Sequence, residues 1–213
     1  VYSFIFSFSS IFFLFSELGL NNYIIKNFAN NKLDFEFLSM ILKIRIFSFF
    51  IIFIVFFVIV FLLFKEFLLY FIIISLFHLF RDFRNFFNSI NKSQNEGSLL
   101  LLGNFSERLL YITLILVLFY FNKLSLYNLF FISFLTVFLQ FLFFYFKYDL
   151  KINLFKGMIF KKIKEIIYSG LPFLFFSISI FLLHYLDQIV LFFFEGAEVL
   201  GWSSVGYKLI KVF

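Results

Sequence analysis

The sequence predicts an all-α integral membrane protein, and its composition and patterning support this class. Of the 213 residues, 63% are hydrophobic, and the mean hydropathy is +1.05, whereas a soluble domain is about half apolar. The apolar residues form long runs, and a helix needs about 20 such residues to cross a bilayer. A chain of this composition has too little polar surface to cover itself in water.

The apolar runs predict about seven transmembrane helices. The first run covers 1–16 and ends at Glu17-Leu18-Gly19, after which 21–36 is a polar segment of mixed charge. The segments 88–98 and 147–169 are expected to be a loop and a basic, partly amphipathic linker. The sixth span is expected to begin at Gly170-Leu171-Pro172 and to turn back at 195–201 into an incomplete seventh. The other predicted spans are 38–64, 67–87, 99–121 and 124–146.

Lysine and arginine are distributed unequally between the two predicted faces of the membrane. When alternate loops are assigned to alternate faces, one face receives the basic loops and helix ends between Lys26 and Lys164. The turns on the opposite face contain only Lys65 and Lys123. Cytoplasmic loops carry an excess of these residues. The net charge of +6 therefore indicates membrane orientation, with long cytoplasmic loops and short outer turns, and does not indicate nucleic-acid binding.

Several kinds of site have no signature in the sequence. There is no cysteine, and the two histidines are His78 and His184, so we expect no metal site; His78 is expected near the membrane interface. No glycine-rich phosphate loop, catalytic triad or paired carboxylates are found, which argues against an enzyme, and no cofactor is expected. The chain begins at Val1 without an initiator methionine and ends at Phe213 within an apolar helix, so we expect a fragment of a longer protein.

Ionised side chains within the spans are the candidate functional residues, because charges at that depth must face water or one another. His184 and Asp187 share one helical face, as do Lys208 and Lys211. Asp187 and Lys208 each lie about 12 Å from the turn between them, so they are expected to meet at one depth. The candidate substrate-binding cations are Arg45, Arg81, Arg84, Arg108, Lys208 and Lys211, and the candidate gating or coupling residues are Glu17, Glu107, His184 and Asp187.

Each candidate also has a structural interpretation that the sequence leaves open. Asp187 and Lys208 could form an ion pair that only fixes the hairpin. Glu107 and Arg108 could belong to a salt bridge with the charged cluster 81–84, and the arginines near the cytoplasmic face could be membrane anchors. Gly170 and Pro172 could begin or kink a helix, or they could be a hinge. Glu17 could be an ordinary helix-end carboxylate, and His184 a packed core residue.

Four stretches of the chain resemble a known family of transporters. They are 2–29, F-R-N-F-F-N-S-I-N-K (83–92), S-G-L-P-F (169–173) and Y-L-D-Q-I-V-L-F-F-F-E-G-A-E-V-L-G-W-S-S-V-G-Y-K-L (185–209), of which the last is the most specific. They are similar to segments of the Wzx-type lipid-linked oligosaccharide flippases, in the MOP superfamily that also holds MurJ and MATE transporters. Trp202 departs from the family pattern, which more often has tyrosine there.

The resemblance implies a MOP/MATE-like helical bundle, of which this chain holds helices two to eight of about 12–14. Residues 1–150 would form most of the first six-helix lobe, and 151–213 an amphipathic linker with the start of the second lobe. The implied function is to flip a polyprenyl-diphosphate-linked oligosaccharide, the repeat unit of an O-antigen, capsule or exopolysaccharide, to the outer leaflet by alternating access. The implied location is the plasma membrane of a bacterium or archaeon, with other polysaccharide assembly proteins as partners.

Other functions remain open at this point. A MATE-like drug or cation antiporter would be expected to carry carboxylates in its cavity, whereas lysine and arginine predominate here. A membrane-embedded polyprenyl-linked glycosyltransferase or polymerase would need a sizeable outer loop, and the outer turns are short. A structural subunit of a respiratory complex would suit the 45 phenylalanines, but it would leave the symmetric placement of Asp187 and Lys208 about the turn unexplained.

Overall fold

The computed structural model describes residues 1–29, 34–148 and 160–210, without the side chains of residues 35, 160, 161, 184, 205 and 207–210. Within these residues every regular element is a helix, and the chain is an all-α membrane protein. The elements are α1 (Tyr2–Leu14), η1 (Phe15–Glu17), α2 (Leu20–Phe28), α3 (Phe35–Leu63), η2 (Lys65–Phe67), α4 (Leu68–Ser93), α5 (Gly97–Tyr120), α6 (Leu126–Tyr148) and α7 (Phe160–Ile210).

Four helices in the described ranges are long and apolar enough to cross a membrane, and there are five if the bent pair α1–α2 forms one span. These four are α3, α5, α6 and the Lys162–Leu183 part of α7. The count is lower than the seven or so expected from the sequence. Helix α4 has the length of a span but carries Arg81, Asp82 and Arg84 in its middle, and that charge exceeds what a lipid-facing helix tolerates.

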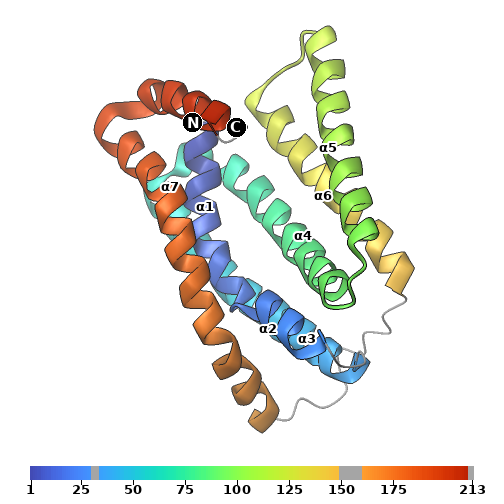
Figure 1. Cartoon of the computed structure of the whole chain (residues 1–213). Coiled ribbons are helices and arrows are strands. Elements are labelled where there is room, and N and C mark those ends of the chain that lie inside the picture. Colours follow the sequence, from blue (N-terminus) through green and yellow to red (C-terminus); the bar gives the residue numbers. More distant parts are fainter. Residues whose placement is uncertain (30–33, 149–159, 211–213) are drawn as a thin grey trace.

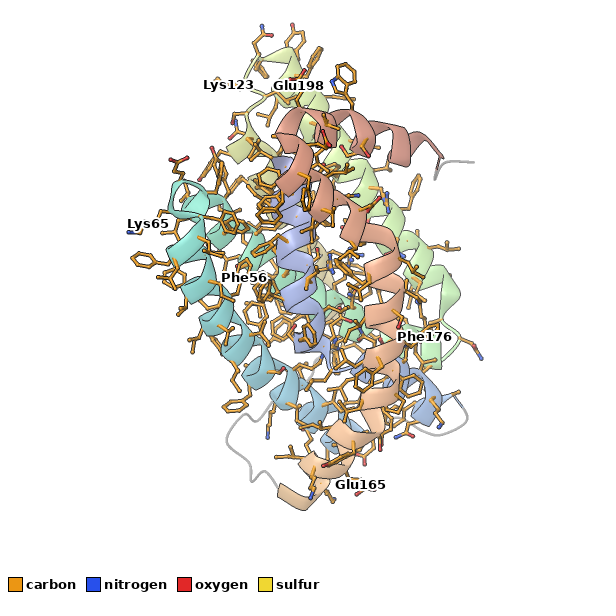
Figure 2. All side chains as sticks on the ribbon, turned by 90° about the vertical axis from the view of Figure 1, so that its left-hand side faces the viewer. Phe56, Lys65, Lys123, Glu165, Phe176 and Glu198 are labelled. Atoms are coloured by element: carbon orange, nitrogen blue, oxygen red, sulfur yellow. The ribbon has the colours of Figure 1, made fainter. Side chains whose placement is uncertain are left out.

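Successive long helices run in alternating directions (Figure 1), and α4 contacts α1, α2, α3, α5 and α6. In Figure 1, α5 and α6 lie on one side of α4, and α1, α2 and α7 lie on the other. Figure 2 shows Lys123 and Glu198 at one end of the molecule and Glu165 at the opposite end. The turns that the sequence assigns to opposite faces are therefore at opposite ends of the bundle.

Two polar segments of the sequence, of which 88–98 is predicted to be a loop, contain helix. Part of the polar segment 21–36 belongs to α2, where Leu20, Ile24 and Phe28 are buried at the four-residue spacing of one helical face. Helix α4 continues to Ser93 and buries Ile90, so that only 94–96 separate it from α5. In both cases the local composition is polar, but the few apolar residues pack against neighbouring helices. These contacts stabilise the helical conformation.

Helix α7 differs from the prediction at both of its expected breaks. It begins at Phe160 and continues through Gly170 and Pro172, because a proline removes one main-chain hydrogen bond and transmembrane helices tolerate this loss. The break is at Gly196, with φ 85° and ψ −177°, a backbone conformation that is essentially restricted to glycine. Beyond it, the helix lies across the end of the bundle (Figure 1) and does not return beside the first part, so the predicted antiparallel hairpin is not found.

A close backbone crossing joins α7 to the break between η1 and α2. Leu18 and Gly19 both have positive φ values, 49° and 68°. A Cβ atom at Gly19 would lie 2.3 Å from the carbonyl oxygen of Gly170, and one at Gly170 would lie 2.5 Å from the carbonyl oxygen of Leu18. Since no larger residue fits at either position, this pair of glycines sets the distance between α7 and the rest of the bundle.

The apolar core is divided into two clusters. The first contains Phe4, Phe56, Phe71 and Phe130, and the second contains Leu20, Leu38, Phe86 and Phe144. Between them along α1–α2, α3 and α4 lies a set of polar side chains, which also extends to α5. We call this set the polar layer, and it consists of Glu17, Arg45, Asp82, Arg84, Asn85 and Glu107.

Candidate functional site

A pocket of about 440 Å³ lies between α1, α4, α5 and α6. This volume is within the usual range for a ligand site. Helical spacing explains which side chains reach it, because residues three or four positions apart share one face. The lining residues are Tyr2 and Phe6 from α1, Phe77, Arg81 and Arg84 from α4, Asn104, Glu107, Arg108 and Tyr111 from α5, and Ser133 and Thr136 from α6.

Arginines dominate the charge of this pocket. Arg81, Arg84 and Arg108 supply three positive charges, and Glu107 supplies the one negative charge of the lining. Arg84 forms an ion pair with Glu107 across the α4–α5 contact, and their side chains are 17% and 19% exposed. The Arg81 guanidinium lies 5.8 Å from the centre of the Phe77 ring, and Arg108 is exposed. The lining is therefore suited to an anionic ligand.

A chain of hydrogen bonds runs from the pocket wall to the break between η1 and α2. Arg84 Nη2 donates to Asn85 Oδ1 at 3.4 Å, and Asn85 Nδ2 donates to Glu17 Oε1 at 3.1 Å. The other oxygen of Glu17 accepts from Asn21 Nδ2 at 2.9 Å. Glu17 thus holds α4 against the turn that contains Leu18 and Gly19, and it does not line the pocket.

Arg45 does not line the pocket, although the sequence predicts it as a cavity cation. Its Nη2 atom lies 2.5 Å from Asp82 Oδ1, and the two side chains are 1% and 6% exposed. The pair joins α3 to α4 in the interior of the bundle. Asp82 pairs the charge of Arg45, while its Nε and Nη1 atoms have no hydrogen-bond partner among the described residues. The position of Arg45 is thus explained by its pairing between helices.

The predicted residues of α7 are described only in part. Asp187 is exposed, and its carboxylate accepts a hydrogen bond from the backbone N–H of Gln188 at 2.8 Å. The side chains of His184 and Lys208 and the whole of Lys211 lie outside the described residues, so the pairing of Asp187 with Lys208 stays a prediction. A contact of α7 with α1 that was not predicted is the hydrogen bond from Ser7 Oγ to Gln188 Oε1, 2.7 Å long.

His78 is buried within the bundle and not at the interface where the sequence places it. Its Nε2 atom lies 3.1 Å from Ser9 Oγ of α1, and its ring stacks on Phe13 at a centroid distance of 4.9 Å. The helix continues well past His78 in both directions, which explains its depth.

Uncharged polar residues of the pocket were missed at the sequence level. Asn104 and Tyr111 lie three or four positions from Glu107 and Arg108, so helical spacing from these charged residues could have identified them. Tyr2, Ser133 and Thr136 come from helices without charged residues at this depth. Their place in the site follows only from how the helices pack.

The comparisons with known proteins give one match. A family model described as polysaccharide biosynthesis protein matches residues 1–213. Neither a curated protein nor a solved structure matches the chain. With its apolar helices, a match over this whole length means that the chain is a multi-pass membrane protein of the polysaccharide biosynthesis protein family, the family of Wzx-type flippases in the MOP superfamily.

Proposed function

We propose that this protein moves a polyprenyl-diphosphate-linked oligosaccharide, the repeat unit of an O-antigen, capsule or exopolysaccharide, from the cytoplasmic to the outer leaflet. The observation that carries the proposal is the gathering of Arg81, Arg84 and Arg108 from two helices around one pocket. A role in polysaccharide biosynthesis is in keeping with the family. The substrate and the direction of transport are the part that we propose.

Clustered arginines suit a diphosphate for geometric and electrostatic reasons. A guanidinium group presents parallel N–H donors that match two phosphate oxygens, and it stays charged in an apolar environment. Bringing a diphosphate into the membrane without such partners would cost many kcal/mol. Arg81, Arg84 and Arg108 would supply these partners, and the same positive charge disfavours the cationic drugs that a MATE-like antiporter would carry.

The rest of the lining suits the sugar. Tyr2, Phe6, Phe77 and Tyr111 offer aromatic faces, and Ser133 and Thr136 offer hydroxyl groups. Binding sites commonly combine aromatic walls with a few polar groups in this way. The lipid tail would remain in the bilayer beside α5, whose apolar side chains are mostly exposed, as at Leu101 and Leu116.

Transport would proceed by alternating access in the plasma membrane of a bacterium or archaeon, with the basic loops in the cytoplasm. In this proposal the crossing of Gly170 with Leu18–Gly19 is the point about which α7 moves, in line with the hinge role predicted for Gly170 and Pro172. Other polysaccharide assembly proteins would supply the substrate and use the product. The proposed role is transport and not catalysis.

The test is a flipping assay with the full-length protein in liposomes that contain a fluorescent polyprenyl-diphosphate-linked oligosaccharide. A membrane-impermeant quencher reports how much labelled sugar reaches the opposite leaflet. The double variant Arg81→Gln/Arg108→Gln should lower the rate about tenfold or more, since a charge-assisted hydrogen bond contributes about 1.5–3 kcal/mol.

Lys65→Gln is the matched control, because Lys65 is an exposed cation in the turn between α3 and α4, and its rate should equal that of the wild type. Equal rates for the arginine variant and this control would contradict the proposal. A wild-type protein that moves the same glycan equally well without the diphosphate would contradict it as well.

A further inference from the structure

Glu107 occupies an unusual position in a pocket suited to anions. It is the one acidic residue among the described lining residues, and it forms an ion pair with Arg84. A carboxylate there reduces the positive charge available to a ligand. We infer that Glu107 is an internal anion that holds Arg84 until the substrate diphosphate displaces it, an inference that rests on the proposed function.

The two partners of the Arg84–Glu107 pair are held differently. Arg84 is fixed by Asn85, which is itself bound to Glu17, so the guanidinium has support from α4 and from the end of η1. Glu107 has no hydrogen-bond partner other than Arg84 among the described residues. When the pair separates, Arg84 therefore keeps its place, whereas the carboxylate is free to turn away.

A diphosphate can also make more contacts in this pocket than Glu107 makes. It offers more acceptor oxygens than one carboxylate, so it can take the place of Glu107 at Arg84 Nη1 and also bind Arg81 and Arg108, which line the same pocket. The exchange thus replaces one ion pair by several charge-assisted hydrogen bonds.

The need for turnover also favours such an internal competitor. A transporter has to release its substrate at the second leaflet, and binding that is equally tight throughout the cycle gives no gain in rate. With Glu107 present, each binding event must break the Arg84–Glu107 pair and each release event forms it again. Glu107 therefore weakens substrate binding and accelerates release.

The test uses the full-length protein in nanodiscs and farnesyl diphosphate, a short prenyl diphosphate, as the ligand. Glu107→Gln removes the charge and keeps the shape of the side chain. We expect it to bind farnesyl diphosphate about tenfold more tightly and to transport more slowly at saturating substrate in the flipping assay. In the Arg84→Gln background, Glu107→Gln should leave the affinity unchanged, because a competitor that acts through Arg84 has no partner there.

Glu96→Gln is the matched control. Glu96 precedes the same helix, pairs with Lys147 at 3.5 Å and is 45% exposed in its side chain, outside the pocket lining. Its loss should change neither affinity nor rate. If Glu107→Gln does not fold, Glu107→Asp gives the same comparison, because the shorter side chain weakens the pair and should also tighten binding.

The outcomes separate this inference from the proposed function. Wild-type protein that binds farnesyl diphosphate no better than farnesol overturns the proposed function, and the inference with it. Wild-type protein that prefers the diphosphate, together with a Glu107→Gln variant whose affinity is equal or weaker, overturns the inference alone. The same gain in affinity with and without Arg84 also overturns it, since Glu107 would then act only as a general repulsive charge.

Discussion

Helices α3 and α4 follow one another in the chain and have 29 and 26 residues, but they are surrounded by different partners. The most apolar 18-residue stretch of α3 has a mean hydropathy of 3.4, and only 17% of its residues are buried. Its exposed residues are large and apolar, with Phe47 66% and Leu62 70% exposed. By contrast, α4 buries His78, Asp82, Ser89 and Asn91.

The contrast follows from position in the bundle. Helix α4 contacts five other helices, so its polar side chains find partners on α1, α2, α3 and α5 and are shielded from lipid. Helix α3 borders the bundle on one side, where lipid tails require apolar side chains. The exception on α3 is the face that turns toward α4, where Arg45 meets Asp82. Polarity in this protein therefore depends on which helix a residue faces and much less on its depth.

The largest expected effect comes from breaking the ion pair that joins the two helices. Arg45→Met should destabilise the folded protein by about 3–5 kcal/mol, because it leaves Asp82 charged and without its partner in the interior. The measurement is thermal unfolding in detergent, followed by size-exclusion chromatography with fluorescence detection. Lys65→Met, at an exposed position in the turn between α3 and α4, is the control and should unfold at the wild-type temperature.

The double variant Arg45→Met/Asp82→Leu tests the cause of that loss. Replacing both charges by apolar side chains removes the desolvation cost together with the attraction, so the double variant should be more stable than Arg45→Met alone. If the double variant is less stable than Arg45→Met alone, an unpaired Asp82 charge is not the cause of the lost stability. The two side chains would then hold α3 against α4 through contacts other than their ion pair.

The sequence predicted the all-α membrane class, although not the break of α7 at Gly196 or the extent of α2 and α4 into polar segments. It also identified Arg81, Arg84 and Arg108 as charges within the apolar runs, because such charges are conspicuous. It was not sufficient for their partners. Successive residues on a helix point about 100° apart, so Asp82 faces α3 while Arg81 and Arg84 face the pocket. The rotation of α4 about its axis decides which of its side chains face α3 and which face the pocket. That rotation is set by contacts between residues distant in the sequence, such as Ser9 with His78.

A smaller effect is expected where backbones touch. Gly170→Ala would place a methyl group against the carbonyl of Leu18, and overpacking of this kind costs about 1–3 kcal/mol. Gly201→Ala is the control on the same helix, since nothing lies within 4 Å of its Cβ position, and it should be neutral or slightly stabilising. Unfolding temperatures of the two variants give the comparison. Equal unfolding temperatures would mean that α7 can move away from α2 without a loss of stability. In that case α7 would not belong to the tightly packed interior that surrounds α4.

The smallest expected effect is that of removing an uncharged hydrogen bond between α1 and α4. Ser9→Ala removes the contact with His78 Nε2, and interhelical hydrogen bonds in membrane proteins contribute on average about 0.6 kcal/mol. Ser179→Ala is the control, because Ser179 is exposed and its hydroxyl group donates only to the backbone of its own helix, at Phe175. The difference in unfolding free energy between the two variants isolates the contact between α1 and α4. If Ser9→Ala lowers the unfolding free energy as much as Arg45→Met does, then leaving His78 without its Ser9 partner is as unfavourable as leaving Asp82 without Arg45. The uncharged contacts of α4 would then hold it as strongly as its ion pair does.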